Sequence, residues 1–150
     1  MHYQKKIGVY ISHRGHLLLI REKTDGNRDY HWNIVKGAFE AKDTSLLQTV
    51  QRECREEVGL QVKIVRVLNI SYRRRRMNPV MQINYCVEST SGRPKLASKK
   101  KQQVLNEDII EAKFFTHQEL LSIPCRELTN IRVWRGIRRW IRQNNTSGTL

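Results

Sequence analysis

The chain has 150 residues, of which 39% are hydrophobic and 28% charged, and it carries a formal net charge of +14. This length suits one domain with a real core, and the composition is typical of a globular protein. No stretch approaches the roughly 20 consecutive apolar residues of a membrane span, so we expect no stable membrane association.

The first strongly patterned segments predict a β-hairpin followed by a short strand. Apolar residues alternate over residues 5–13, and a more continuous apolar run covers residues 17–20. Arg14 and Gly15 between them favour a turn. Residues 24–29 carry Asp, Gly and Asn and predict a loop, after which residues 32–36 predict a short strand.

A helix is predicted to begin near Ser45, because Asp43, Thr44 and Ser45 are all good N-cap residues. Its apolar stripe has helical spacing and should face the core. The stripe contains Leu46, Leu47, Val50, Cys54 and Val58. Gly59 suits the left-handed position that ends many helices, so the predicted helix stops there.

The second half of the chain predicts three more strands and two more helices. Strands are expected over residues 62–71, 80–87 and 109–115, with the arginine run 73–76 before a turn at Asn78-Pro79. Residues 89–103 are nearly free of apolar side chains, so they predict a mobile loop.

Thr116 and Glu119 have the spacing of a capping box, which opens a short helix. A final helix over residues 127–142 is expected to pack through the stripe Ile131, Trp134, Ile137 and Ile141, with Trp140 beside it. We therefore predict an α/β sandwich around a mixed sheet, with one domain over residues 1–143 and a flexible tail over residues 144–150.

The cysteines and the charge indicate compartment and partners. Cys54, Cys86 and Cys125 are odd in number and form no C-x-x-C pair, which favours reduced thiols over a disulfide framework or zinc site. With no signal-peptide cleavage site after Met1, we expect a cytoplasmic protein. The net charge of +14 predicts attraction to nucleotides, RNA or an acidic surface, and a merely solubilising face explains it equally well.

The segment from Arg52 to Leu60 contains the main candidate metal-binding and catalytic residues. Glu53, Glu56 and Glu57 lie three and four positions apart, so they share one face of the predicted helix and repel one another. A cation above them would relieve that repulsion, and Mg²⁺ prefers carboxylate oxygens together with substrate phosphates. These carboxylates lie off the apolar stripe, where we expect metal and solvent to reach them.

Residues 37–60 resemble the box of the Nudix hydrolases, in which G, five residues, E and seven residues precede R-E-U-x-E-E-x-G-U. The second half fits, with Cys54 as the apolar residue. Counting from Gly37 places Asp43 at the first acidic position and leaves eight residues before Arg52. Counting back from Arg52 instead places Ala38 at the glycine position and Thr44 at the first acidic position. We favour the Gly37 register with one inserted residue, in which the acid braces the loop.

The resemblance implies a Nudix-type α/β/α sandwich with a loop-helix-loop motif that hydrolyses diphosphate linkages. It implies that Glu53 and Glu57 bind Mg²⁺ or Mn²⁺, that Glu56 shares the shell, and that the Gly37 carbonyl is a further ligand. Arg52 would orient a box carboxylate through bidentate hydrogen bonds. Related chains often carry a catalytic acid near the strand after residue 108, so the general base is expected to be Asp108 first and Glu107 second.

Substrate contacts follow from the same resemblance and from the local chemistry. Trp32 and Lys36 stand where a related branch carries W-x-x-P-K-G, although Val35 replaces the proline. Tyr72 and the arginine run could stack a base and hold phosphates, or form a solvated loop. The predicted function is a metal-dependent pyrophosphohydrolase of a nucleoside diphosphate derivative. The alternative is a non-catalytic or RNA-directed nucleic-acid-binding module on the same fold.

Overall fold

A mixed seven-stranded sheet organises the part of the chain that the computed structural model describes, residues 2–24, 26–74 and 77–147. Its strand order is β3-β2-β1-β6-β5, with β4 pairing with β1 and β7 with β2. β1 and β6 run parallel and the other pairs are antiparallel. The strands are β1 Gln4–His13, β2 His16–Glu22, β3 His31–Asn33, β4 Val35–Ala38, β5 Val62–Arg73, β6 Val80–Ser89 and β7 Ile109–Phe115.

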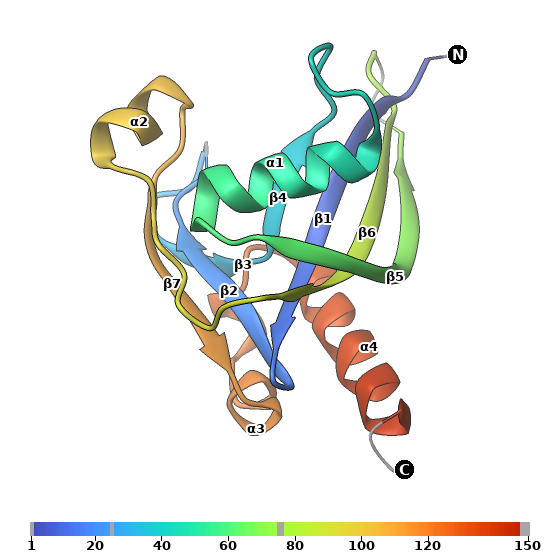
Figure 1. The fold of residues 1–150 in the computed structure, drawn as a ribbon, viewed down its shortest axis with the longest axis vertical. Helices are drawn as coiled ribbons and strands as arrows, with labels where there is room; N and C mark the ends of the chain where they lie inside the picture. The colour runs from blue at the N-terminus through green and yellow to red at the C-terminus, as the bar shows by residue number, and fades with distance from the viewer. Residues whose placement is uncertain (1, 25, 75–76, 148–150) are drawn as a thin grey trace.

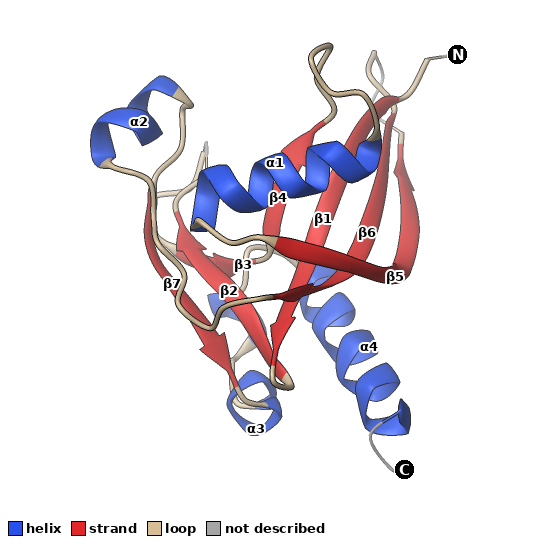
Figure 2. Ribbon diagram, viewed as in Figure 1, coloured by secondary structure: helices blue, strands red, loops and turns tan. Residues whose placement is uncertain are grey.

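Helices cover both faces of this sheet, as Figures 1 and 2 show. They are α1 Leu46–Val58, α2 Lys99–Val104, α3 His117–Leu121 and α4 Ile131–Ser147, with a 3₁₀ turn at Cys125–Glu127. None of the described helices is long and apolar enough to cross a membrane. The predicted α/β class, with helices packed around a mixed sheet, is confirmed.

Side chains that alternate between the two faces of the central strands pack into two separate hydrophobic cores. Leu18 and Ile20 of β2 pack in the core under α1, whereas Leu17 and Leu19 pack in the core under α4. Successive side chains of a strand point to opposite faces, so a continuous apolar run is the expected pattern for a strand covered on both sides. The predicted hairpin of β1 and β2 is confirmed by their antiparallel pairing.

The predicted strand over residues 32–36 is in fact divided between two partners. β3 pairs with β2, and β4 pairs with β1 from Val9 opposite Val35 to Lys6 opposite Ala38. Asn33 lies at the break, where its Oδ1 accepts from the Ile34 N–H at 2.8 Å and its Nδ2 donates to the Glu22 carboxylate at 2.6 Å. The bond to Ile34 is local, whereas the bond to Glu22 reaches the neighbouring strand; together they interrupt the ladder at Asn33, where the pairing partner changes.

The predicted loop over residues 89–103 contains helix α2 instead of being irregular throughout. Ser98 caps α2. The three lysines that begin α2 give this segment the composition of a solvated loop, so composition alone does not indicate a helix. Gln102 is buried and ties α2 to β7, because its Oε1 accepts from the Ile109 N–H at 2.7 Å and its Nε2 donates to the Ile109 carbonyl at 3.2 Å.

The apolar stripes of α1 and α4 differ in part from the prediction. Leu47 is 47% exposed and Ile131 is 46% exposed, so neither is a core residue. α4 begins at Ile131 and not at residue 127, after Asn130 accepts a capping hydrogen bond from the Val133 N–H. Its buried side chains are Val133, Ile137, Trp140 and Ile141. α4 continues to Ser147, within the predicted tail, and residues 148–150 lie outside the described part of the chain.

Candidate active site

Helix α1 begins and ends where the sequence predicts. Of the three candidate N-caps, Ser45 is the one used, because its side chain accepts from the Gln48 N–H at 3.1 Å. Gly59 adopts the left-handed conformation (φ 64°) and its N–H donates to the Arg55 carbonyl at 3.0 Å. Cys54 is fully buried against the sheet, as predicted. The charged face of α1 is thereby turned toward the loop that follows β4.

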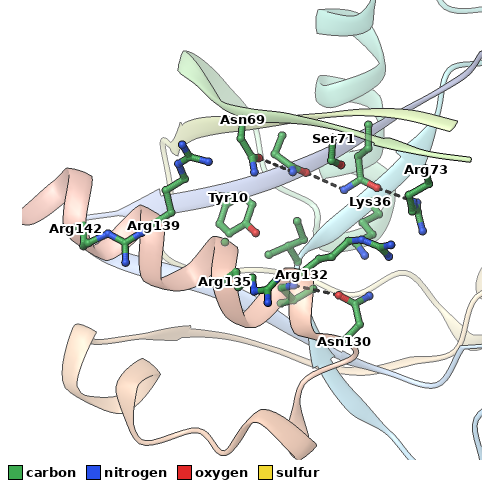
Figure 3. A pocket seen from close by; sticks show the side chains of 15 residues that line it. Tyr10, Lys36, Asn69, Ser71, Arg73, Asn130, Arg132, Arg135, Arg139 and Arg142 are labelled. Carbon is green, nitrogen blue, oxygen red and sulfur yellow. Dashed lines mark hydrogen bonds between the residues drawn. The ribbon is translucent and has the colours of Figure 1, made fainter.

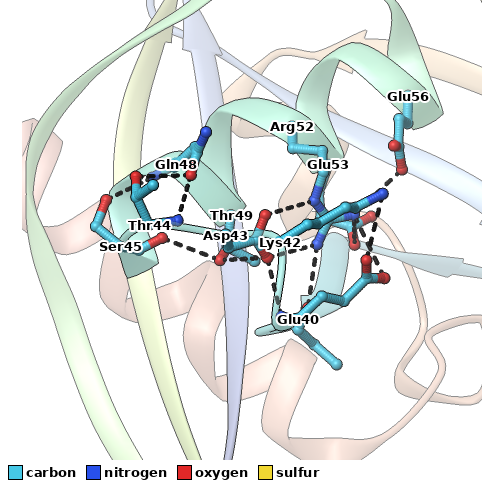
Figure 4. Close-up of polar contacts among 11 residues, drawn as sticks. Glu40, Lys42, Asp43, Thr44, Ser45, Gln48, Thr49, Arg52, Glu53 and Glu56 are labelled. Atoms are coloured by element: carbon cyan, nitrogen blue, oxygen red, sulfur yellow. Dashed lines mark hydrogen bonds and ion pairs between the residues drawn. The ribbon is translucent and has the colours of Figure 1, made fainter.

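Arg52 and Asp43 clamp this loop to the helix (Figure 4). Arg52 Nε and Nη2 donate to the two oxygens of Asp43, each at 2.9 Å. Asp43 also accepts from the Thr49 hydroxyl at 3.0 Å and from the Glu40 N–H at 2.9 Å. The Arg52 guanidinium therefore holds the pKa of Asp43 well below its usual range. This geometry fits the Gly37 register, in which Asp43 is the first acid and braces the loop.

The same guanidinium reaches two of the box carboxylates. Arg52 Nη1 donates to Glu53 Oε1 at 3.1 Å and to Glu56 Oε2 at 3.3 Å. Its bidentate pair, however, is with Asp43, and its contacts with the glutamates are single bonds. Arg52 is thus anchored on one side by Asp43 and orients the glutamates on the other.

Three carboxylates meet at the C-terminal half of α1. One oxygen each of Glu53, Glu57 and Glu107 lies within 4.8 Å of the others. Glu53 and Glu57 are each only 7% exposed, so the expectation that solvent reaches them freely is wrong. Oε2 of Glu57 and Oε2 of Glu107 are buried and have no hydrogen-bond partner in the described structure. We call these three residues the carboxylate cluster.

Burial shifts the protonation of the whole cluster. Desolvation raises the pKa of Glu53 from 4.5 to about 7, although Arg52 partly opposes it. Desolvation and then the neighbouring Glu53 raise the pKa of Glu57 well above its ordinary value, and burial also raises the pKa of Glu107. Hard divalent cations prefer carboxylate oxygens as ligands, and the converging, buried oxygens of this cluster need a positive partner. These residues therefore fit Mg²⁺ or Mn²⁺.

Gly37 brings the end of strand β4 against the cluster. A Cβ atom added at Gly37 would overlap the Glu53 carboxylate, so only glycine allows this approach. Glu107 completes the cluster from the segment before β7. The sequence predicts Glu107 as a possible base and not as a ligand, because only the folded chain brings it against Glu57.

The other predicted site residues lie at different distances from the cluster. Glu56 is hydrogen-bonded to Arg52 and is outside the group of converging oxygens. Asp108 is exposed, and both of its carboxylate oxygens lie 2.9 Å from the Tyr30 hydroxyl, which donates to them. Trp32 packs edge-on against Phe115 with ring centres 4.9 Å apart.

Two cavities adjoin Lys36. The first, of about 620 Å³, includes Gly37, Glu107 and Asp108 in its wall, and we call it the carboxylate cavity. The second, of about 380 Å³, lies between the sheet and α4 (Figure 3), and we call it the arginine cavity. Lys36, Arg73 and Gln82 line both. Burial lowers the pKa of Lys36 to about 8.

Tyr72 lines neither cavity. It is 62% exposed and contacts Tyr3 edge-on, with ring centres 5.7 Å apart. Within the predicted arginine run, Arg73 borders both cavities, whereas residues 75–76 lie outside the described part of the chain.

Comparisons with known proteins agree with this geometry. The model of the NUDIX domain matches residues 2–135. No curated protein matches the chain in sequence. Among solved structures, the chain is similar to the MutT protein from Methanosarcina mazei Go1, with 19% identity, 95% of each chain covered and a TM-score of 0.70.

Two further solved structures share the fold. A NUDIX hydrolase from Nitrosomonas europaea matches with 17% identity over 95% of this chain and 90% of that one, with a TM-score of 0.73. An Ap4A hydrolase from C. elegans matches with 12% identity over 95% and 98%, with a TM-score of 0.68. Because the family model spans nearly the whole chain, the protein belongs to the Nudix hydrolase family.

Proposed function

We propose that this chain is a divalent-metal-dependent hydrolase that cleaves the diphosphate linkage of a nucleoside diphosphate derivative. The observation that carries the proposal is the carboxylate cluster, in which two buried oxygens have no hydrogen-bond partner. Such an arrangement is costly while the carboxylates are ionised and no cation is bound, and a divalent cation would remove that cost.

Glu53, Glu57 and Glu107 would hold the cation, with the Gly37 carbonyl and Glu56 as further ligands by resemblance to the family. A divalent cation there supplies polarisation of the phosphoryl oxygens and acidification of water. The chain's own part is to fix the ligands, because Asp43 anchors Arg52 and Arg52 orients Glu53.

Asp108 remains our first choice for the general base. It lines the carboxylate cavity and its carboxylate is held by the Tyr30 hydroxyl, whereas Glu107 is committed to the cluster. On the substrate side, Lys36 would contact the phosphates. Trp32 and Tyr72 line neither cavity, so their contacts would be with a part of the substrate that extends beyond both. The position of Lys36 in the walls of both cavities supports its role.

A hydrolysis panel tests this function. Nucleoside triphosphates, dinucleoside polyphosphates, nucleotide sugars and capped RNA would be incubated with the protein in Mg²⁺ and in excess EDTA. We expect cleavage of at least one diphosphate substrate in Mg²⁺ alone. Glu57→Gln should lower turnover by roughly 10²–10⁴-fold, whereas the exposed control Glu111→Gln should not. Full activity in EDTA, or an unimpaired Glu57→Gln, would refute the metal assignment.

A second candidate is an RNA-directed nucleic-acid-binding module on the same fold. It is favoured by the net charge of +14 and by the four arginines that α4 turns toward one cavity. Affinity for single-stranded RNA should then fall steeply with salt, by roughly one unit of logarithmic slope per phosphate contacted. A flat salt dependence, or no binding, would remove this candidate.

We further propose that residues 1–143, together with the continuation of α4 to Ser147, act as one domain and that the protein works in the cytoplasm. The free thiols of Cys54, Cys86 and Cys125 support a reducing compartment.

A further inference from the structure

All of the charged side chains that line the arginine cavity are cationic. Its cationic side chains come from β4, β5 and α4, and none of the described residues in its wall is acidic. They are Lys36, Arg73, Arg132, Arg135, Arg139 and Arg142. Positive charges gathered around one hollow repel one another, and a bound anion relieves that repulsion.

The spacing along α4 explains how one helix supplies four of these charges. Arg132, Arg135, Arg139 and Arg142 are three or four positions apart, so they share one face of the helix. Gly136 on the same helix permits close packing on the sheet, because an added Cβ would overlap the Tyr10 hydroxyl. The arginines are therefore held at the rim of a cavity whose floor is the sheet (Figure 3).

The floor of the cavity offers hydrogen-bond donors from amide side chains. Arg73 Nη2 donates to Gln82 Oε1 at 3.3 Å, Gln82 Nε2 to Asn84 Oδ1 at 2.8 Å, and Asn84 Nδ2 to Asn69 Oδ1 at 2.7 Å. A guanidinium can only donate, so Arg73 fixes the direction of this chain of bonds. Each amide oxygen already accepts one bond, and the chain ends on the amino group of Asn69.

This predominance of donors identifies the ligand chemistry. The edge of a nucleobase presents both donors and acceptors, whereas a phosphate presents acceptors and negative charge. Planar guanidinium groups match phosphate oxygens in bidentate geometry. A phosphate monoester carries about −1.5 to −2 charges at neutral pH, more than a phosphodiester, and so suits a small hollow ringed by arginines.

We propose that the arginine cavity binds a phosphate monoester that the substrate carries in addition to its scissile diphosphate. This inference rests on the proposed function for the diphosphate, and it names a substrate class: small nucleotide derivatives with a separate terminal phosphate. The two cavities are adjacent, because Lys36, Arg73 and Gln82 line both, and the proposal places one molecule across the two.

Matched ligand pairs test the proposal. NADP⁺ differs from NAD⁺, and coenzyme A from dephospho-coenzyme A, by one phosphate monoester. Binding would be measured calorimetrically in EDTA at about 0.15 M salt, so that no hydrolysis occurs. In at least one pair, the phosphorylated member should bind about tenfold more tightly or better, the value of one strong charge-assisted contact. Equal affinity within both pairs would overturn the proposal.

A matched pair of variants assigns the effect to this cavity. Arg135→Gln/Arg139→Gln removes two charges from the cavity rim, and it should abolish the preference for the phosphorylated member. The control Arg126→Gln/Arg138→Gln removes the same charge elsewhere, because Arg138 stacks on Trp134 at 4.0 Å and neither residue lines the cavity. The control should keep the preference. Equal loss in both variants would show a general charge effect and contradict the assignment.

Two further measurements separate the competing explanations. A single-stranded RNA pentanucleotide without terminal phosphate should bind more weakly than the phosphorylated ligands, and tighter binding that depends on Arg135 and Arg139 would replace the monoester by a phosphodiester chain. Hydrolysis in Mg²⁺ is followed separately. A protein that prefers the phosphorylated ligands but cleaves no diphosphate would refute the proposed function and leave the phosphate site standing.

Discussion

Glu53→Gln should make the metal-free protein more stable at alkaline pH. Burial raises the pKa of Glu53 from 4.5 to about 7, so keeping this carboxylate ionised at pH 8 costs the folded state about 3 kcal/mol, at about 1.4 kcal/mol per pKa unit. Glutamine has nearly the same shape, carries no charge to desolvate, and its oxygen can still accept from Arg52.

The pH dependence follows from the direction of the shift. A carboxyl whose pKa is raised in the folded state favours folding at low pH, and that contribution is lost as pH rises from the unfolded value of 4.5 through about 7. The gain from Glu53→Gln should therefore be about 1–3 kcal/mol at pH 8 and below about 1 kcal/mol at pH 5.

Thermal unfolding in EDTA measures this difference. In a chain of this size, about 1 kcal/mol corresponds to roughly 2–4 °C, so the variant should melt several degrees above the unmodified protein at pH 8. Addition of Mg²⁺ should raise the melting temperature of the unmodified protein more than that of the variant. A variant that is less stable at pH 8, or a difference independent of pH, would refute the reasoning.

Three other substitutions test the loop, the clamp and the core. Gly37→Ala should lower turnover by on the order of 10²-fold with the fold retained by circular dichroism, because its methyl group would displace the Glu53 carboxylate; unchanged kinetics would contradict the close approach. Asp43→Asn should weaken Mg²⁺ binding about 10–100-fold in calorimetry, since Arg52 loses its bidentate partner, and unaltered affinity would show that the clamp is dispensable. Cys54→Ala should cost on the order of 1 kcal/mol in denaturant unfolding without altering turnover, and selective loss of activity would count against its core role.

Much of the fold was predictable because its signals are local. The alternation in β1, the continuous apolar run in β2 and the cap residues Ser45 and Gly59 each act within a few residues. The predicted strand at residues 32–36 failed for a non-local reason, since Asn33 bonds to Glu22 on a neighbouring strand. α2 was missed because its lysines resemble a solvated loop, and no sequence pattern indicates that Gln102 bonds to the backbone of Ala97 and Ile109.

The site residues also divide into those with a local sequence signal and those without one. Glu53 and Glu57 follow from spacing along one helix, and the register of the box places Asp43 as the acid that braces the loop. The bidentate pair of Arg52, expected on a box carboxylate, is formed with Asp43 instead. The position of Glu107 depends on how the β7 segment approaches α1, and no pattern within the chain encodes that approach. The burial of the carboxylates differs from the prediction, because a position off the apolar stripe predicts exposure, whereas β4 and the loop after it cover that face of α1.

Binding of Mn²⁺ tests the central claim most directly, because it reports on the carboxylate cluster without requiring a substrate. The free-ion signal in electron paramagnetic resonance would be followed as protein is added at pH 7.5, for the unmodified chain, for Glu57→Gln and for the exposed control Glu111→Gln. The unmodified chain and the control should deplete the signal, and Glu57→Gln should leave most of it. Equal depletion by Glu57→Gln and the unmodified chain would contradict a metal site built on Glu53, Glu57 and Glu107.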